Sequence, residues 1–309
     1  MKNFARVFFA VMGVLCVVSA RADVGVAIVA ARTACGGISE SVKKLQVMAG
    51  INVAVSGVGT VAAGGALYAG IKKDQSDKLA ERIQEGLDKL DSLSDEEFFH
   101  LIGRIADWKA EKDKQAGLEN ARDAEIQKSR NLGHWRTGLM AGNTALNIGG
   151  AIVSDKNKND GMEIKDQVAE CLSAVKALRA EAMQSLIDGG ADAGDIVVAQ
   201  KIADACGRFV MRDAENIPKR QDVAKWSSVA GVGTGALGVA ASVAANTKAV
   251  RDNKSDVGKK TEKNLNLAAN VLAGASVVAG GLATGFNIAT IASIGKVMGV
   301  AEECEGALQ

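Results

Sequence analysis

The stretch LQVMAGINVAVSGVGTVAAGGALYAGI, Leu45–Ile71, decides the fold that this sequence adopts. It runs for 27 residues without a charged side chain or a proline and consists mainly of glycine, alanine and valine. Three further uncharged runs follow at Thr137–Ser154, Trp226–Thr247 and Asn264–Gly295, and charged stretches separate the four. A single proline in 309 residues and 4% aromatic residues leave little of the turn chemistry that strand-rich proteins need. We expect an all-α fold of long helical hairpins forming an elongated bundle, with four Gly/Ala-rich apolar helices and charged amphipathic helices between them.

Small residues recur in these four runs at spacings of three, four and seven. Residues four and seven apart lie on one face of a helix, and a face of glycine and alanine lets two backbones approach closely. The pattern therefore predicts faces through which the helices pack. The residues expected at these contacts are Gly50, Gly57, Gly64, Gly138, Gly142, Gly149, Gly231, Gly235, Gly238, Gly281, Gly285 and Ala289.

The second and third runs resemble each other. Each begins at a tryptophan or two residues after one, Trp226 or Trp135, and each ends in a Lys/Asn/Asp stretch that we expect to form a turn. The tetrapeptide Gly-Val-Gly-Thr also occurs twice, at Gly57–Thr60 and Gly231–Thr234. These matches indicate an old duplication of helical hairpins.

The charged stretch Lys72–Arg130 has the pattern of a helical hairpin. Apolar residues recur at helical spacing in its first half and form one stripe on a solvated helix. Ser94 to Glu97 then match a capping box that begins a second helix, and the polar tail Lys109–Arg130 is expected to project into water or to fray. The expected stripes are Leu79, Ile83, Leu87 and Leu90 in the first helix, and Phe98, Leu101, Ile102 and Ile105 in the second.

A second helix pair lies between the second and third runs. The glycine-rich loop Asp188–Asp195 joins its two helices, and Pro218 is expected to end the pair because proline lacks a backbone N–H. The expected inward residues are Ile164, Val168, Leu172 and Val175 in one helix, and Val198, Ile202, Ala205 and Phe209 in the next.

The N-terminus has the layout of a secretory signal peptide. Lys2 and Arg6 precede an apolar core at Val7–Val18, which is too short to span a bilayer, and a small-x-small cleavage site follows at 20–22. We therefore expect an exported protein, located in the periplasm, in the cell envelope or outside the cell. The expected organisation is a signal peptide at 1–22, a first helical half at 23–160 with the charged hairpin 72–130, a central hairpin at 161–218 and a C-terminal Gly/Ala-rich hairpin at 219–309.

Four cysteines follow the expected signal peptide: Cys35, Cys171, Cys206 and Cys304. An even number in an oxidising compartment indicates two disulfides, for which three pairings exist. Antiparallel folding about the loop at Asp188–Asp195 brings Cys171 near Cys206. We expect that pair, which leaves Cys35 to bond Cys304. No C-x-x-C spacing occurs, so the sequence gives little support to a redox motif or a zinc site.

Charge and motifs argue against several classes of function. Without residues 1–22 the chain has 34 Lys+Arg and 36 Asp+Glu, a net charge of −2, whereas nucleic-acid binding calls for a clustered basic surface. Gly57–Ala62 and Gly231–Ala236 fit G-x-G-x-x-A, but a dinucleotide site also needs a βαβ unit. Asp155–Gly161 resembles a calcium loop with its glycine one position late, and we expect a polar turn there. His100 and His134 have no matching Cys or carboxylate cluster.

We therefore expect no catalytic, cofactor-binding or metal site, no cofactor and no small-molecule substrate. The favoured function is non-enzymatic: an exported cell-envelope protein that self-associates, or associates with membrane lipid, through its Gly/Ala-rich hairpins. Trp135 and Trp226 then lie where interfacial aromatics belong. The first alternative is a soluble periplasmic or secreted bundle that acts as a scaffold or binding module, and the second is an enzyme of unrecognised type. Outward apolar faces favour the membrane, and mutually buried apolar faces favour the soluble bundle.

Overall fold

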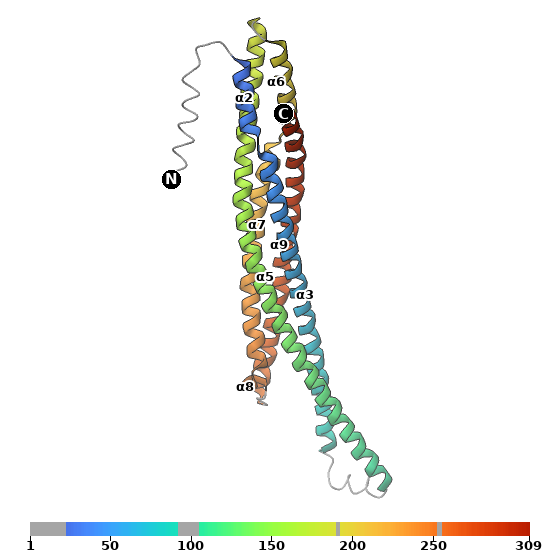
Figure 1. Ribbon diagram of the computed structural model, residues 1–309. Helices are drawn as coiled ribbons and strands as arrows, with labels where there is room; N and C mark the ends of the chain where they lie inside the picture. The colour runs from blue at the N-terminus through green and yellow to red at the C-terminus, as the bar shows by residue number, and fades with distance from the viewer. Residues whose placement is uncertain (1–22, 92–104, 190–191, 252–254) are drawn as a thin grey trace. The chain divides into compact units, whose positions relative to one another are not determined.

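The computed structural model describes residues 23–91, 105–189, 192–251 and 255–309. Almost all of these residues are helical and none is in a strand, which confirms the all-α class (Figure 1). The expected signal peptide lies outside the described residues, as do the capping box at Ser94 and the stripe residues Phe98, Leu101 and Ile102. The helices are α2 (Val24–Cys35), α3 (Ile38–Asp91), α5 (Ile105–Ile187), α6 (Ala193–Cys206), α7 (Met211–Asn246), α8 (Lys248–Arg251) and α9 (Asp256–Leu308).

The helices run further than the sequence pattern predicts. The turn expected after the second run is wrong, because α5, which is 83 residues long, continues without a break through Asp155–Gly161. Lys, Asn and Asp weaken a helix only slightly, and positive backbone φ, which a glycine turn uses, occurs among the described residues only at Gly37 and Gly189. Gly189 lies in the expected loop after α5, and α7 ends at Asn246, where the third run was expected to end in a turn.

Pro218 lies inside α7, so the expectation that it ends a helix is wrong. A proline within a helix loses one backbone hydrogen bond and costs about 3 kcal/mol. Packing against α5 offsets that cost here. Gly161 of α5 approaches so closely that a Cβ on it would lie 2.7 Å from Ile217 Cγ2 and 3.3 Å from the nitrogen of Pro218.

The chain divides into two units, and each of α3, α5, α7 and α9 contributes residues to both. Unit 1 comprises Met1–Met48, Asn157–Lys219 and Ala289–Gln309, and unit 2 comprises Ala49–Lys156 and Arg220–Ile288. The two units bury different kinds of side chain: mainly large aliphatic residues in unit 1, and mainly small and polar residues in unit 2.

Unit 1 has an ordinary apolar core. The helix α2 packs on α6, and the expected stripes of the central helix pair face inward at Ile164, Val168 and Ile202. Surface ion pairs such as Lys43 with Glu302 surround this core. The further buried residues include Val24, Ile28, Ile38, Val42, Leu45, Val175, Leu178, Phe209, Ile217, Ile294 and Val297.

Unit 2 has a core of small and polar residues. Buried positions recur alternately three and four residues apart on each helix, which is the seven-residue repeat of helices packed along their length. The expectation that Leu79 faces inward is wrong, because Leu79 is 46% exposed. Ala80 and Leu87, which follow the repeat, are buried. The buried residues of α3 in this unit include Asn52, Ser56, Gly59, Ala63, Ala66, Gly70, Lys73 and Ser76.

Candidate membrane interface

One end of the unit 2 core is a layer of buried amides and hydroxyls, the Asn52 layer, formed by Asn52, Ser56, Ser154, Gln221 and Asn287. The Nδ2 of Asn52 donates to Ser154 Oγ at 2.7 Å and to Asn287 Oδ1 at 3.0 Å. The Nε2 of Gln221 donates to the same Asn287 oxygen at 3.1 Å. None of the five side chains is more than 2% exposed, so the layer joins α3, α5, α7 and α9 out of contact with solvent.

The other end of this core is the Arg136 layer, formed by Arg136, Thr137, Ser242, Asn266 and Asn270. Arg136 is fully buried, and its guanidinium donates to Ser242 Oγ at 3.0 Å, to Asn266 Oδ1 at 2.9 Å and to Asn270 Oδ1 at 3.3 Å. These acceptors are neutral. Burial lowers the pKa of Arg136, and the charge of Asp77 acts in the opposite direction. Arginine nevertheless stays charged, so this layer buries a cation among hydroxyls and amides.

Between the two layers the core alternates apolar and hydroxyl contacts. Met140 is buried against Ala66 and Ala273, with four half-buried aliphatic residues around them. Thr234 and Ser276 share a hydrogen bond of 2.8 Å between α7 and α9. The core of unit 2 is therefore closed by small side chains and internal hydrogen bonds, and it contains few of the large aliphatic groups that fill unit 1.

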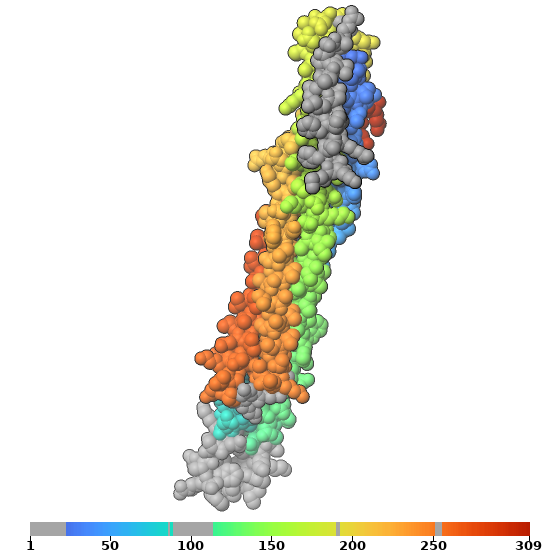
Figure 2. All heavy atoms as spheres, turned by 90° about the vertical axis from the view of Figure 1, so that its left-hand side faces the viewer, coloured from blue at the N-terminus to red at the C-terminus, as the bar shows by residue number. Residues whose placement is uncertain are grey.

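The outer surface of unit 2 between the layers is apolar and, apart from Asp222 and Lys225 close to Gln221, uncharged, and we call it the apolar belt. No Asp, Glu, Lys or Arg occurs in residues 53–69, 137–153, 226–241 or 271–286. The segments of α5 (green) and α7 (orange) lie side by side on the face shown in Figure 2. Large aliphatic residues that are 41% to 76% exposed form the belt: Val58, Val61, Ile148, Ile152, Val229, Leu237, Val271, Val278 and Leu282.

Within the part of the chain that the structure describes, three helical stretches are long and apolar enough to cross a membrane by length and composition. They lie in Val24–Glu85, Ala193–Asn246 and Asp256–Leu308. Only 28%, 33% and 39% of the residues in their most apolar windows are buried within the structure, so most residues of each window are half-buried or exposed. The second run, on α5, is not among these stretches, and its Asn143 and Asn147 are buried.

The height of the apolar belt follows from the spacing of the two layers along the helices. Arg136 and Ser154 are 18 residues apart on α5, and Asn270 and Asn287 are 17 apart on α9. At 1.5 Å per residue these separations correspond to about 26 Å. The hydrocarbon core of a bilayer is about 30 Å thick, so the belt has nearly the height that a membrane requires.

Exposed aromatic residues lie near both ends of the belt. Tyr68 and Trp135, near the Arg136 layer, are 62% and 67% exposed, and Trp226, on the side of the Asn52 layer, is 61% exposed. Each end also pairs an aromatic ring with a lysine. Lys72 Nζ lies 5.7 Å from the Tyr68 ring centre, and Lys225 Nζ lies 5.7 Å from that of Trp226.

Ion pairs mark the same two levels. Lys73 contacts Asp77 at 2.6 Å and Glu262 at 3.6 Å near the Arg136 layer. Lys225 contacts Asp155 at 2.7 Å near the Asn52 layer, and this hydrogen bond raises the pKa of the lysine. Charges therefore resume on both sides of the belt.

The predicted packing glycines divide into two groups. A Cβ on Gly231 would lie 2.8 Å from Asn147 Cγ, and one on Gly235 or Gly238 would collide with Thr144 or Met140, so these three lie at helix contacts. The others do not form the expected close contacts. A Cβ on Gly149 would make only an ordinary van der Waals contact, and Ala289 is half-buried. At the remaining seven glycines an added Cβ would meet no atom of a neighbouring element within 4 Å: Gly50, Gly57, Gly64, Gly138, Gly142, Gly281 and Gly285.

Other glycines at close contacts were not predicted. A Cβ on Gly70 would collide with Asn270, one on Gly280 would lie 2.7 Å from Thr60 Oγ1, and one on Gly133 would lie 3.0 Å from Asn246 Nδ2. Most of these glycines follow the seven-residue repeat set by Asn52, Ser56 and their equivalents. A search for polar and small residues at that repeat would have found them.

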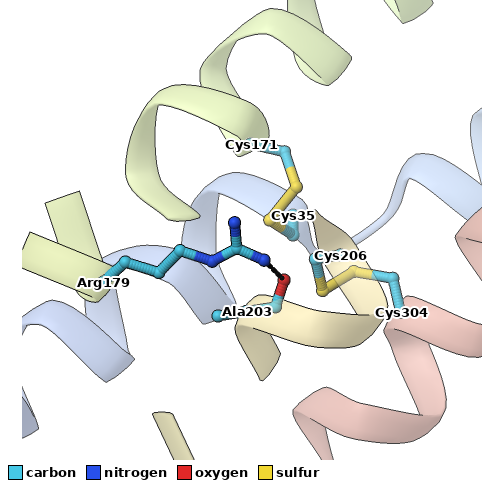
Figure 3. The surroundings of a disulfide bond; sticks show 6 residues. All are labelled: Cys35, Cys171, Arg179, Ala203, Cys206 and Cys304. Carbon is cyan, nitrogen blue, oxygen red and sulfur yellow. Dashed lines mark hydrogen bonds between the residues drawn. A yellow bond between two sulfur atoms is a disulfide. The ribbon is translucent and has the colours of Figure 1, made fainter. Parts of the chain in front are cut away.

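The four cysteines meet in the core of unit 1, where they form what we call the cysteine cluster (Figure 3). The bonds join Cys35 to Cys171 and Cys206 to Cys304, so the expected pairing of Cys171 with Cys206 is wrong. Those two residues do lie together, because all four Sγ atoms are within 4.8 Å of one another. A hairpin argument cannot choose a partner when four thiols meet at one point.

The remaining sequence motifs take helical conformations. Gly57–Ala62 lies in α3 and Gly231–Ala236 in α7, with helix and not strand before each. Asp155 pairs with Lys225 from within α5. His134 is exposed on α5, and His100 lies outside the described residues.

The chain matches no protein-family model, and no curated protein or solved structure shows significant similarity to it. The fold and the interface therefore define its class: a disulfide-bonded helical bundle with an uncharged, outward-facing apolar belt.

Proposed function

We propose that the protein is a non-enzymatic, exported cell-envelope protein that associates with membranes through unit 2. The apolar belt is the observation that carries this proposal. It places valine, isoleucine and leucine outward and asparagine, serine and arginine inward, whereas valine, isoleucine and leucine fill the core of unit 1. A soluble helix turns its apolar stripe to the core, whereas a helix in lipid turns small and polar residues to its neighbours.

The polar groups of unit 2 suit a bundle that enters lipid as one piece. Polar side chains within a bilayer face the bundle interior and pair with one another, as the Asn52 layer does. The α5 segment, which is less apolar than the other three, is carried in by these hydrogen bonds. The exposed Tyr68, Trp135 and Trp226 supply the aromatic anchors that membrane proteins place at the lipid–water interface.

A soluble helical bundle that acts as a scaffold is the second candidate. The hydrogen bonds that join the helices within the Asn52 and Arg136 layers favour it, because they are made between residues of the chain and need no lipid. The two functions are compatible if one follows the other in time: the chain folds in water first and then binds a bilayer through the apolar belt.

Flotation of the purified chain with phosphatidylcholine–phosphatidylglycerol vesicles on a density gradient tests the proposal. We expect the wild-type chain to float with the vesicles. Val61→Asp places a carboxylate at the middle of the belt, where it costs about 3 kcal/mol in lipid, so we expect about a hundredfold weaker vesicle binding.

Val257→Asp is the matched control. Val257 is 75% exposed and Val61 is 76% exposed, so the two substitutions meet similar surroundings in water. Val257 lies nine residues before Asn266, outside the belt, and its variant should float like the wild type. A wild-type chain that never floats, or two variants that bind equally well, would assign the chain to the soluble class.

A further inference from the structure

The cysteine cluster has an arrangement that two structural disulfides do not require. Its members come from four different helices, α2, α5, α6 and α9, and are separated by up to 136 residues within a bonded pair. All four side chains are at most 4% exposed. Two disulfides can stabilise one core whatever the distance between the two bonds. Here, however, every sulfur lies within 4.8 Å of the other three.

That spacing is close to the geometry of a tetrathiolate metal site. Zinc binds four cysteine sulfurs tetrahedrally at about 2.3 Å, which places the sulfurs about 3.8 Å apart. The sulfurs of each bonded pair would have to separate to reach that geometry, and the four helices already bring all four of them to one point. We propose that the reduced cysteine cluster binds one Zn²⁺, so that unit 1 is closed either by two disulfides or by a zinc ion.

The two states are linked by a balanced reaction. Two molecules of a dithiol reduce the two disulfides, each passing two electrons and two protons to one bond and becoming a disulfide itself. The four resulting thiols then release four protons as one Zn²⁺ binds, giving a Zn(Cys)4 site with a net charge of −2. No zinc binds before reduction, because a disulfide sulfur has no thiolate to offer.

The surroundings of the cluster favour this ion. Thiolates in tetrahedral geometry select zinc over hard cations such as Mg²⁺ and Ca²⁺, which prefer oxygen ligands. Arg179 lies beside the cluster in Figure 3 and donates to the carbonyl oxygen of Ala203 at 2.8 Å. Its Nη2 would also lie 2.8 Å from a Cβ on Gly207, the residue after Cys206. The guanidinium also lies 3.8 Å from Asp204 Oδ1, so it stands between that carboxylate and the cluster.

The primary sequence carries none of the usual spacing of a zinc site, since no two of these cysteines lie close along the chain. The site exists only because four helices meet in unit 1. It is independent of the membrane proposal, which concerns residues of unit 2.

Native mass spectrometry of the full chain tests the inference, with Cys16→Ser as background so that only the cluster offers thiols. The chain is reduced with a trialkylphosphine: each disulfide consumes one phosphine and one water, gives two thiols and one phosphine oxide, and the two bonds together leave four thiols. At equimolar zinc we expect one bound ion in the reduced chain and none in the oxidised chain. With Cd²⁺ we expect the ultraviolet charge-transfer band of cadmium thiolate, and bound zinc should protect all four thiols from alkylation.

Cys171→Ser and Cys304→Ser remove one ligand from each bonded pair. Each should weaken zinc binding by the reduced chain at least tenfold, with helicity followed by circular dichroism. Because zinc binding also drives folding, a reduced chain that loses its helices still binds if the inference is right. No zinc on the reduced wild-type chain, folded or unfolded, overturns it, as does binding that both serine variants leave unchanged.

Discussion

The tetrapeptide Gly-Val-Gly-Thr occurs twice in unit 2, and its two copies turn different glycines inward. In α7 the first glycine, Gly231, is buried against Asn147, and Gly233 meets open space. In α3 the order is reversed: Gly57 meets open space, and a Cβ on Gly59 would lie 3.3 Å from Asn143 Oδ1. The same four residues therefore sit in two registers of the seven-residue repeat.

This difference gives a prediction at the scale of single residues. Gly57→Ala should stabilise the chain by up to about 1 kcal/mol, because alanine favours helix and nothing obstructs its methyl group. Gly231→Ala should destabilise it by about 1 to 3 kcal/mol, because buried Asn147 must move. Urea unfolding followed by circular dichroism measures both.

The second glycine of each copy is the internal control, because the expected changes in stability have the opposite sign there. Gly233→Ala should stabilise, and Gly59→Ala should not. Equal effects at all four positions would mean that the register of α3 or α7 differs from that described.

At the scale of elements, the helices of unit 2 are held by a few polar residues that each serve several partners. Asn287 of α9 accepts from Asn52 of α3 and from Gln221 of α7 through one oxygen, and its amide donates to Ser56 Oγ at 3.4 Å. The Oδ1 of Asn52 and the Oε1 of Gln221 have no partner in the structure. The loss of one amide from the layer would therefore leave further buried polar atoms without a hydrogen-bond partner.

Asn287→Ala should destabilise the chain by about 2 to 4 kcal/mol, because two buried donors lose their acceptor at once. Ile288→Ala, at the next position, is the control: Ile288 is 55% exposed, and its loss should change stability by less than about 0.5 kcal/mol. The free energy of unfolding in the absence of lipid is the measurement. An Asn287→Ala chain as stable as the Ile288→Ala chain would show that the layer does not hold the helices.

At the scale of the whole molecule, the two units are stabilised in different ways. Unit 1 contains both disulfides and a core of valine, isoleucine and leucine. Unit 2 contains all three tryptophans, Trp108, Trp135 and Trp226, and no disulfide joins its described residues. Tryptophan fluorescence therefore reports on unit 2, while circular dichroism reports on both.

Reduction of the disulfides in the presence of a metal chelator should destabilise unit 1 selectively. Each bond closes a loop of about a hundred residues, so its loss should cost about 2 to 5 kcal/mol. We expect the circular dichroism transition to split, with one part moving to lower denaturant, while the fluorescence midpoint moves less. Equal shifts of both signals would show that the two units unfold as one.

The sequence by itself determined the all-α class, the four uncharged runs and the meeting of Cys171 with Cys206. These follow from local chemistry: one proline, few aromatics, long uncharged runs and a glycine-rich loop at the middle of a helix pair. The same local reasoning failed at Pro218 and at Asp155–Gly161, where contacts with a neighbouring helix or a lysine outweigh weak helix-breaking tendencies.

Only the tertiary structure decided which face of each run points inward and which cysteines bond. In a run of glycine, alanine and valine every face is small and apolar, so the contrast that normally identifies the core side of a helix is absent. The buried positions are instead marked by Asn52, Ser56 and the other polar residues that usually indicate a surface. Their hydrogen bonds need acceptors on other helices, and no single helix contains that information.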